Sequence, residues 1–143
     1  MENAERYPFI NAAIALGEAG FRPYLPISLT NQQHSVTTSA LLDTGATVNV
    51  LPYPLGIELG CSWERQTTTL NLTGNLAQYE ARVLLLQIEV ARFNPVQLVF
   101  AWTKAENVPL ILGQVNFFME FDVCFHRSQL YFEVCPKAGV LDS

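Results

Sequence analysis

Short runs of β-branched and aromatic residues recur along the chain, and each run ends at glycine, proline or a small polar cluster. This pattern is typical of strands joined by turns, and it predicts a mainly β domain, a small barrel or a sandwich. One helix is expected, over residues 114–121, whereas the proline and glycines within residues 53–61 indicate a loop or short turn. The expected strands span residues 24–29, 36–42, 47–52, 67–72, 78–90, 96–102, 110–112, 123–125 and 130–134.

The composition fits one folded domain with a partly covered surface. The chain has 143 residues, of which 50% are hydrophobic and 15% charged, and its net charge is −5. This length and apolar content suit a single core and exclude a disordered chain. Because charged residues usually make up about a quarter of a soluble domain, we expect a partner to cover part of this surface.

The chain divides into three parts. Residues 1–20 form a partly ordered N-terminal segment, residues 21–135 the folded domain, and residues 136–143 a C-terminal tail. Within the first part, we expect residues 1–8 to be frayed and residues 9–16 to form a first strand or a helical turn.

The sequence argues against several classes of partner. Its eight Lys and Arg residues are scattered singly, without the basic stripe that nucleic-acid binding needs. No apolar stretch approaches the roughly 18–20 residues of a membrane span, so we expect no membrane insertion. No basic region followed by a long apolar run opens the chain, and we therefore expect a cytoplasmic protein without a signal peptide.

The three cysteines give no sign of a disulfide framework or a metal site. Cys61, Cys124 and Cys135 are odd in number, and we expect reduced, mostly buried thiols. Cys124, His126 and Cys135 do not follow a recurrent zinc spacing, and no Cys-x-x-Cys occurs. We therefore expect neither a metal nor a cofactor.

Asp43 is the residue that fits its surroundings least. It follows Ala40-Leu41-Leu42 at the end of an apolar strand and precedes Thr44-Gly45-Ala46. Burying an ionised carboxylate is costly unless it is hydrogen-bonded or protonated. Two interpretations fit the local sequence: a functional carboxyl group, or an Asx turn in which Asp43 bonds its own backbone before Gly45.

The wider sequence around Asp43 is similar to a known family. The segment LLDTGATVNVLP resembles the active-site loop of aspartic proteases, and PLILGQVNFFMEFDV, further along, resembles the apolar-apolar-Gly segment and helix of the same family. Their order and separation, with a glycine-containing hairpin between them, make residues 21–135 similar to the retropepsin-like (retroviral-type) family. The ending FFMEFDVCFHRSQLYFEV looks more like bacterial single-domain members than viral ones.

This resemblance implies a small closed β-barrel with one short helix near the C-terminus, forming half of a C2 dimer. The chemistry needs two carboxyl groups, one to take a proton from water and one to give a proton to the scissile carbonyl. The chain has only one Asp-Thr-Gly, so each subunit of a homodimer would contribute Asp43 at the two-fold axis, where the pair shares a proton. The implied substrates are extended peptides or proteins.

The resemblance also gives roles to the residues around Asp43. Thr44 would bond across the axis and brace the two loops. Gly45 would let a substrate backbone pass close to the loop, and Ala46 would keep the floor shallow. Leu72-Thr73-Gly74-Asn75 would form a mobile flap over the substrate, with an ordinary surface hairpin as the alternative.

By the same resemblance, Ile111, Leu112 and Gly113 would cross behind the Asp43 loop, with Gly113 allowing a close backbone approach. A further set of apolar residues either lines substrate pockets or belongs to the core. This set is Val48, Leu51, Leu110 and Ile111.

Two positions depart from the viral pattern. Viral members usually have an acidic residue where this chain has Thr47, and Arg where it has Gln114. Both members of a common ion pair are therefore absent together, and a neutral contact between Thr47 and Gln114 is one replacement. These departures bear on dimer strength and specificity, not on the chemistry of Asp43.

Three hypotheses result. The first is a homodimeric aspartic endopeptidase that cuts extended, largely apolar peptides. The second is a retropepsin-like fold that binds peptides or dimerises without cleaving them. The third is a β-barrel binding protein in which Asp43 forms only an Asx turn. The intact Asp43-Thr44-Gly45-Ala46 favours the enzyme, because a binding module has little use for a carboxyl group at an apolar axis.

Overall fold

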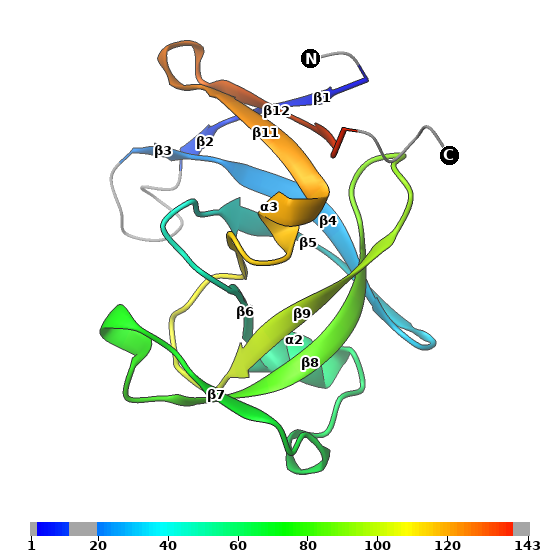
Figure 1. Ribbon diagram of the computed structural model, residues 1–143, viewed down its shortest axis with the longest axis vertical. Helices are drawn as coiled ribbons and strands as arrows, with labels where there is room; N and C mark the ends of the chain where they lie inside the picture. The colour runs from blue at the N-terminus through cyan, green and yellow to red at the C-terminus, as the bar shows by residue number, and fades with distance from the viewer. Residues whose placement is uncertain (1–2, 12–19, 139–143) are drawn as a thin grey trace.

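Six strands close into a barrel in the computed structural model, which describes residues 3–11 and 20–138 (Figure 1). Each strand pairs with the next around the ring, and β4 pairs with β8 through Ser28–Thr30 to close it. The short strand β7 (Thr69–Asn71) adds to β8 outside the ring. In barrel order the strands are β4 (Tyr24–Asn31), β5 (His34–Leu42), β10 (Ile111–Leu112), β6 (Asn49–Pro52), β9 (Val96–Thr103) and β8 (Glu80–Glu89).

The barrel encloses side chains that alternate along its strands. Leu25, Ile27 and Leu29 of β4 are buried, because every second residue of a strand faces the same side. In β9, Leu98 and Phe100 are buried, whereas Gln97 and Val99 between them are exposed. Burial of each such side chain contributes roughly 1.5–3 kcal/mol to stability.

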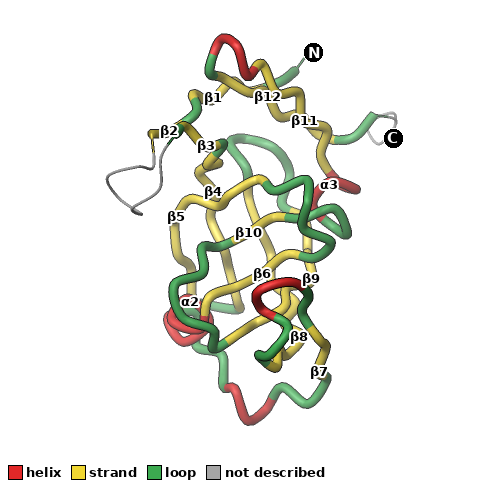
Figure 2. The backbone as a smooth tube through the Cα atoms, turned by 90° about the vertical axis from the view of Figure 1, so that its left-hand side faces the viewer, coloured by secondary structure: helices red, strands yellow, loops and turns green. Residues whose placement is uncertain are grey.

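A three-stranded antiparallel sheet stands at one end of the barrel in both views (Figures 1 and 2). The expectation that residues 1–8 fray is wrong for residues 5–8, because β1 pairs along its length with β12, and Tyr7 stacks on Phe132 at 5.6 Å. Residues 1–2 of that prediction lie outside the described residues. The strands predicted over residues 123–125 and 130–134 are confirmed and pair as an antiparallel hairpin, although Leu130 lies in the turn between them. The sheet order is β1 (Glu5–Pro8), β12 (Tyr131–Pro136) and β11 (Phe121–His126).

Two short strands, β2 (Ile10–Asn11) and β3 (Phe21–Arg22), pair with each other next to this sheet. The start of the segment predicted over residues 9–16 is thus a strand. Residues 12–16 of that prediction lie outside the described residues.

The helices differ from the sequence prediction. Residues 53–61, expected as a loop, contain the helix α2 (Tyr53–Glu58), in which Tyr53 stacks on Trp102 at 5.4 Å. The predicted helix over 114–121 is limited to α3 (Phe117–Glu120). Neither helix, nor any other in the described ranges, is long and apolar enough to cross a membrane. Single 3₁₀ turns occupy Trp63–Arg65, Gly74–Leu76 and Arg127–Gln129.

Candidate active site

Asp43 lies one residue beyond the end of β5, where the chain leaves the barrel wall. Its N–H donates to the carbonyl oxygen of Leu112 (3.0 Å), and its own carbonyl accepts from the N–H of Ala46 (3.1 Å). Its side-chain Oδ1 accepts a hydrogen bond from the N–H of Gly45 at 2.9 Å, so an Asx turn is present. This turn uses one carboxylate oxygen only, since Oδ2 has no hydrogen-bond partner among the described residues.

The segment that contains β10 passes directly behind the Asp43 loop. Figure 2 shows β10 between β5 and β6, and it pairs with both strands. Beyond β10, the N–H of Gln114 donates to the carbonyl of Ala46 at 2.9 Å. The N–H of Val115 donates to the carbonyl of Thr47 at 2.8 Å. Backbone hydrogen bonds therefore join the two segments on both sides of Gly113.

Gly113 lies where these two segments are closest. A Cβ at this position would lie 2.6 Å from the carbonyl oxygen of Val48 and 2.8 Å from that of Ala46. Both atoms belong to the backbone and cannot turn aside as a side chain can. The close approach therefore requires glycine.

Asn49, the first residue of β6, is an additional buried component of the site. Its Oδ1 accepts the N–H of Gly113 at 2.8 Å, and its Nδ2 donates to the carbonyl of Val99 at 3.0 Å. The side chain is fully buried. Sequence reasoning missed it, although an amide inside the apolar run of residues 48–51 was the available signal, because buried polar groups need specific partners.

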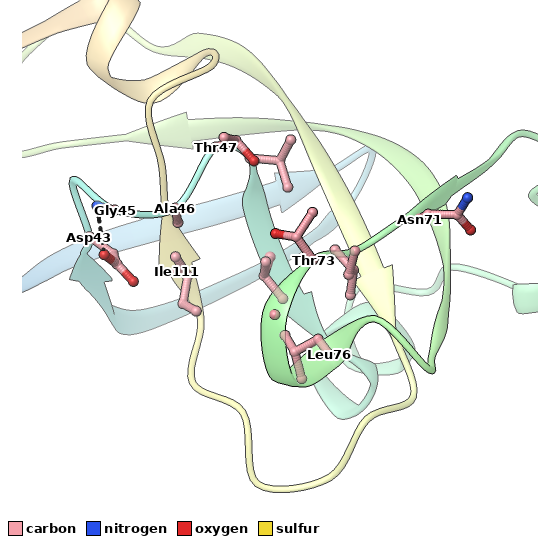
Figure 3. Close-up of a pocket in the computed structure, with 12 residues that line it drawn as sticks. Asp43, Gly45, Ala46, Thr47, Asn71, Thr73, Leu76 and Ile111 are labelled. Atoms are coloured by element: carbon pink, nitrogen blue, oxygen red, sulfur yellow. Dashed lines mark hydrogen bonds between the residues drawn. The ribbon is translucent and has the colours of Figure 1, made fainter.

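A pocket of about 330 Å³ lies between the Asp43 loop and the segment after β7 (Figure 3). Asp43 and Ala46 lie on one side of it, Thr73 and Leu76 on the other, and Ile111 between them (Figure 3). This volume falls within the roughly 300–1,000 Å³ of typical ligand pockets. The structure thus brings the predicted carboxyl group and the predicted flap to one cavity.

The predicted flap is longer than the sequence indicates. The β7–β8 ladder ends at the pair Asn71 and Glu80, so the connection spans residues 72–79 and includes one 3₁₀ turn. Thr73 and Gly74 are exposed and line the pocket, as does Leu76.

Leu72 has a different place from the one expected for a flap tip. It lines the pocket, as predicted, but it is buried in a small cluster at the base of the loop, so it anchors the loop. Asn75 lies in the 3₁₀ turn, and its side chain is outside the described part of the structure. The cluster consists of Val50, Leu72, Ala81 and Ala101.

The two departures from the viral pattern lie next to each other, but not as a side-chain pair. The Nε2 of Gln114 donates to the backbone carbonyl of Thr44, and Thr47 is bonded through its own carbonyl to Val115. The expected contact between the side chains of Thr47 and Gln114 is therefore replaced by a bond from Gln114 to the Asp43 loop.

The other predicted residues divide between loop, pocket and core. Thr44 and Gly45 are exposed on the loop. Val48 and Ile111 are half-buried and line the pocket. Leu51 and Leu110 are buried in the core, as is Leu112.

Cys61 and Cys135 are poor candidates for chemistry. Burial raises the pKa of Cys61 and, together with the nearby Asp122 carboxyl, that of Cys135. A raised pKa keeps these thiols protonated at neutral pH, and the thiolate is the reactive form. Within the described residues, no group of three or more His, Cys, Asp or Glu side chains is arranged to hold a metal ion.

The architecture is similar to that of a solved aspartic protease. A retropepsin-like aspartic protease from Rickettsia conorii matches 92% of this chain and 91% of its own, with a TM-score of 0.62 and 14% sequence identity. The EIAV protease in complex with the inhibitor HBY-793 matches 64% of this chain and 81% of its own, with a TM-score of 0.42 and 20% identity. No protein-family model and no curated protein matches the sequence. The likeness to the Rickettsia protein confirms the predicted fold: the chain has the retropepsin-like fold, mainly β with a closed barrel.

Proposed function

We propose that this protein is an aspartic endopeptidase that acts as a homodimer, with Asp43 of each subunit forming the catalytic pair. The observation that carries the proposal is the setting of Asp43. Asp43 follows an apolar strand, and hydrogen bonds to Leu112 and Ala46 fix its backbone. Its carboxyl group accepts the N–H of Gly45 through Oδ1 and has Oδ2 available beside a pocket. The fold supports the same activity, because the Rickettsia protein with this fold is an aspartic protease.

The surface around Asp43 suits contact with a second copy. Thr44, Gly45 and Thr47 are exposed and uncharged, and Val115 is 52% exposed although it is apolar. A neutral surface adds no like-charge repulsion when two identical carboxyl groups approach each other across a two-fold axis. One chain offers one such carboxyl, so the pair requires two chains.

In the proposed reaction, one Asp43 carboxylate takes a proton from a water molecule, whose oxygen bonds to the scissile carbonyl carbon. The protonated Asp43 of the second subunit gives its proton to the carbonyl oxygen, which produces a neutral gem-diol. The C–N bond then breaks: the nitrogen receives a proton from one carboxyl, and a hydroxyl returns a proton to the other. No covalent bond to the enzyme forms.

The pocket indicates an extended and largely apolar substrate. Val48, Val50 and Ile111 line its floor, and the exposed residues of the 72–79 loop form the opposite side. A peptide lying between the Asp43 loop and this loop would be covered on both faces. Such enclosure excludes water other than the attacking molecule.

The test compares wild type with Asp43→Asn, using a peptide library at several pH values. Wild type is expected to cleave best at mildly acidic pH, because the pair must hold one proton. Asp43→Asn is expected to lose cleavage by roughly 10³-fold or more while keeping its unfolding temperature.

Asp122→Asn is the matched control, since Asp122 is exposed on β11 and should be dispensable. Cleavage retained by Asp43→Asn, or a maximum above about pH 8, contradicts the proposal. Peptide binding by wild type without cleavage supports the non-catalytic binding module instead.

A further inference from the structure

Two asparagine side chains bind the same backbone unit of β9. Asn49 Nδ2 donates to the carbonyl of Val99 at 3.0 Å, and Asn116 Oδ1 accepts the N–H of Val99 at 2.5 Å. Strand β6 begins at Asn49, which is in register with Phe100, so no β6 residue lies opposite Val99. The two side chains thus supply the hydrogen bonds that a neighbouring strand would make to Val99 at this point of the barrel wall.

Both asparagines are also connected to the segment behind the Asp43 loop. Asn116 belongs to this segment, and Asn49 binds it directly. Asn49 Oδ1 accepts the N–H of Gly113, and Asn116 ends the same segment before α3. Asn116 has φ 83° and ψ −74°, a conformation that non-glycine residues rarely adopt. Such a conformation persists when surrounding bonds hold it, and the bond to Val99 is one that does so.

The segment held in this way determines where Asp43 lies. Leu112 accepts the N–H of Asp43, and the N–H groups of Gln114 and Val115 bind the loop that follows Asp43. These bonds lie on either side of Gly113, whose own N–H donates to Asn49 Oδ1. A displacement of residues 112–116 from β9 would therefore displace the Asp43 loop.

We infer that Asn49 and Asn116 are positioning residues for Asp43, which they hold in register with the barrel by clamping residues 112–116 to Val99. The inference rests on the proposed function, because it concerns the geometry of the proposed catalytic pair. Neither residue lines the pocket beside Asp43. Their effect should thus be on the rate of the chemical step and not on substrate binding.

The first test uses two variants of Asn116. Asn116→Gly removes the acceptor while tolerating the positive φ, and Asn116→Asp keeps an oxygen acceptor for the N–H of Val99. We expect Asn116→Gly to lower kcat by roughly 10- to 100-fold with KM within about 2-fold of wild type. Asn116→Asp should recover most of that loss. Wild-type kcat in Asn116→Gly, or equal losses in both variants, overturns the inference.

The second test separates positioning from general stability. Asn49 and Thr103 are both fully buried polar residues, but the side-chain hydroxyl of Thr103 accepts the nearby N–H of Ala105 and bonds no other described residue. Asn49→Ala should lower kcat with KM preserved, whereas Thr103→Val should lose stability without a change in kcat. Equal kcat in the two variants contradicts the inference.

A readout independent of cleavage distinguishes failure of the inference from failure of the proposed function. In amide hydrogen exchange, the N–H groups of Gln114 and Val115 should exchange at least about 10-fold faster in Asn116→Gly and Asn49→Ala than in wild type and Thr103→Val. Absence of peptide cleavage by wild type would refute the proposed function alone. Unchanged exchange at these two amides would refute the clamp, whatever the activity.

Discussion

At the scale of single residues, Gly113 lies where backbone atoms leave no room for a side chain. A methyl group there would meet the backbone carbonyls of Val48 and Ala46 at 2.6 and 2.8 Å. We predict that Gly113→Ala lowers the free energy of unfolding by roughly 1–3 kcal/mol, because one segment must move away from the other. The same shift disturbs the Asp43 loop, so cleavage should fall as well. Thermal unfolding and peptide cleavage measure the two effects.

Gly74→Ala is the control for Gly113→Ala. Nothing lies within 4 Å of a Cβ on Gly74, although its φ of +65° carries some strain. The residue lies in an exposed loop that can rearrange without the barrel. Its substitution should therefore lower the unfolding temperature less than Gly113→Ala does. Equal shifts in the two variants would show that crowding behind the Asp43 loop is not what makes Gly113 sensitive.

Asp43 was predictable because it breaks a local rule: it puts a carboxyl group after an apolar strand. The place of Gly113 behind the Asp43 loop was implied by the resemblance to the retropepsin-like family and not by the local sequence. Asn49 and Asn116 were not predicted, because their importance depends on a partner far along the chain. Val99 lies 50 residues from Asn49 and 17 from Asn116, and no local pattern indicates such a pairing.

At the scale of elements, the 72–79 loop is anchored at its base and exposed toward the pocket. Leu76 lies in its 3₁₀ turn and lines the pocket opposite Asp43 (Figure 3). We predict that Leu76→Ala lowers kcat/KM for apolar peptides by roughly 10-fold, because apolar contact with the substrate is lost. The loss should appear mainly in KM. Steady-state kinetics with one peptide substrate measures it.

Leu85→Ala is the matched control for this loop. Leu85 is 54% exposed on β8, where it lies in register with Val99, and it does not line the pocket. The substitution removes the same atoms from an exposed side chain and should leave kcat/KM unchanged. If the two leucine variants behave alike, the 72–79 loop is an ordinary surface hairpin.

The strands were more predictable than the helices for a physical reason. Alternating burial imposes a visible period on a strand, so most of the barrel strands could be placed from the sequence. In α2, Pro54 and Gly56 suggested a loop, but proline is tolerated in the first turn of a helix. α3 is shorter than predicted because Asn116 has φ 83° and ψ −74°, outside the helical region, so the helix begins only at Phe117.

At the scale of the whole molecule, the terminal strands pair within one chain. β12 has β1 on one side and β11 on the other, from the pair Glu5 and Val134 onward. Both edges of β12 are therefore occupied, and a second copy could extend this sheet only beside β1 or β11. The neutral, partly apolar surface around Asp43 is the more suitable contact for a symmetric partner.

This arrangement leads to a prediction about mixed subunits. If each active site takes Asp43 from two chains, a dimer of one wild-type and one Asp43→Asn subunit is inactive. After subunit exchange in an equal mixture, cleavage per wild-type subunit should fall to about half, because random pairing puts about half of these subunits in mixed dimers. A large excess of Asp43→Asn should remove nearly all activity.

The same mixture made with Asp122→Asn subunits should retain full activity, since these subunits keep Asp43. Native mass spectrometry shows whether mixed dimers have formed. A failure of subunit exchange is then not mistaken for activity of the mixed dimers. Dilution gives a second measurement, because a dimer dissociates when the protein concentration falls below its dissociation constant. The specific activity of wild type should therefore fall at such concentrations. Constant activity per wild-type subunit in verified mixed dimers would mean that one Asp43 suffices, and the two-carboxyl mechanism would then be wrong.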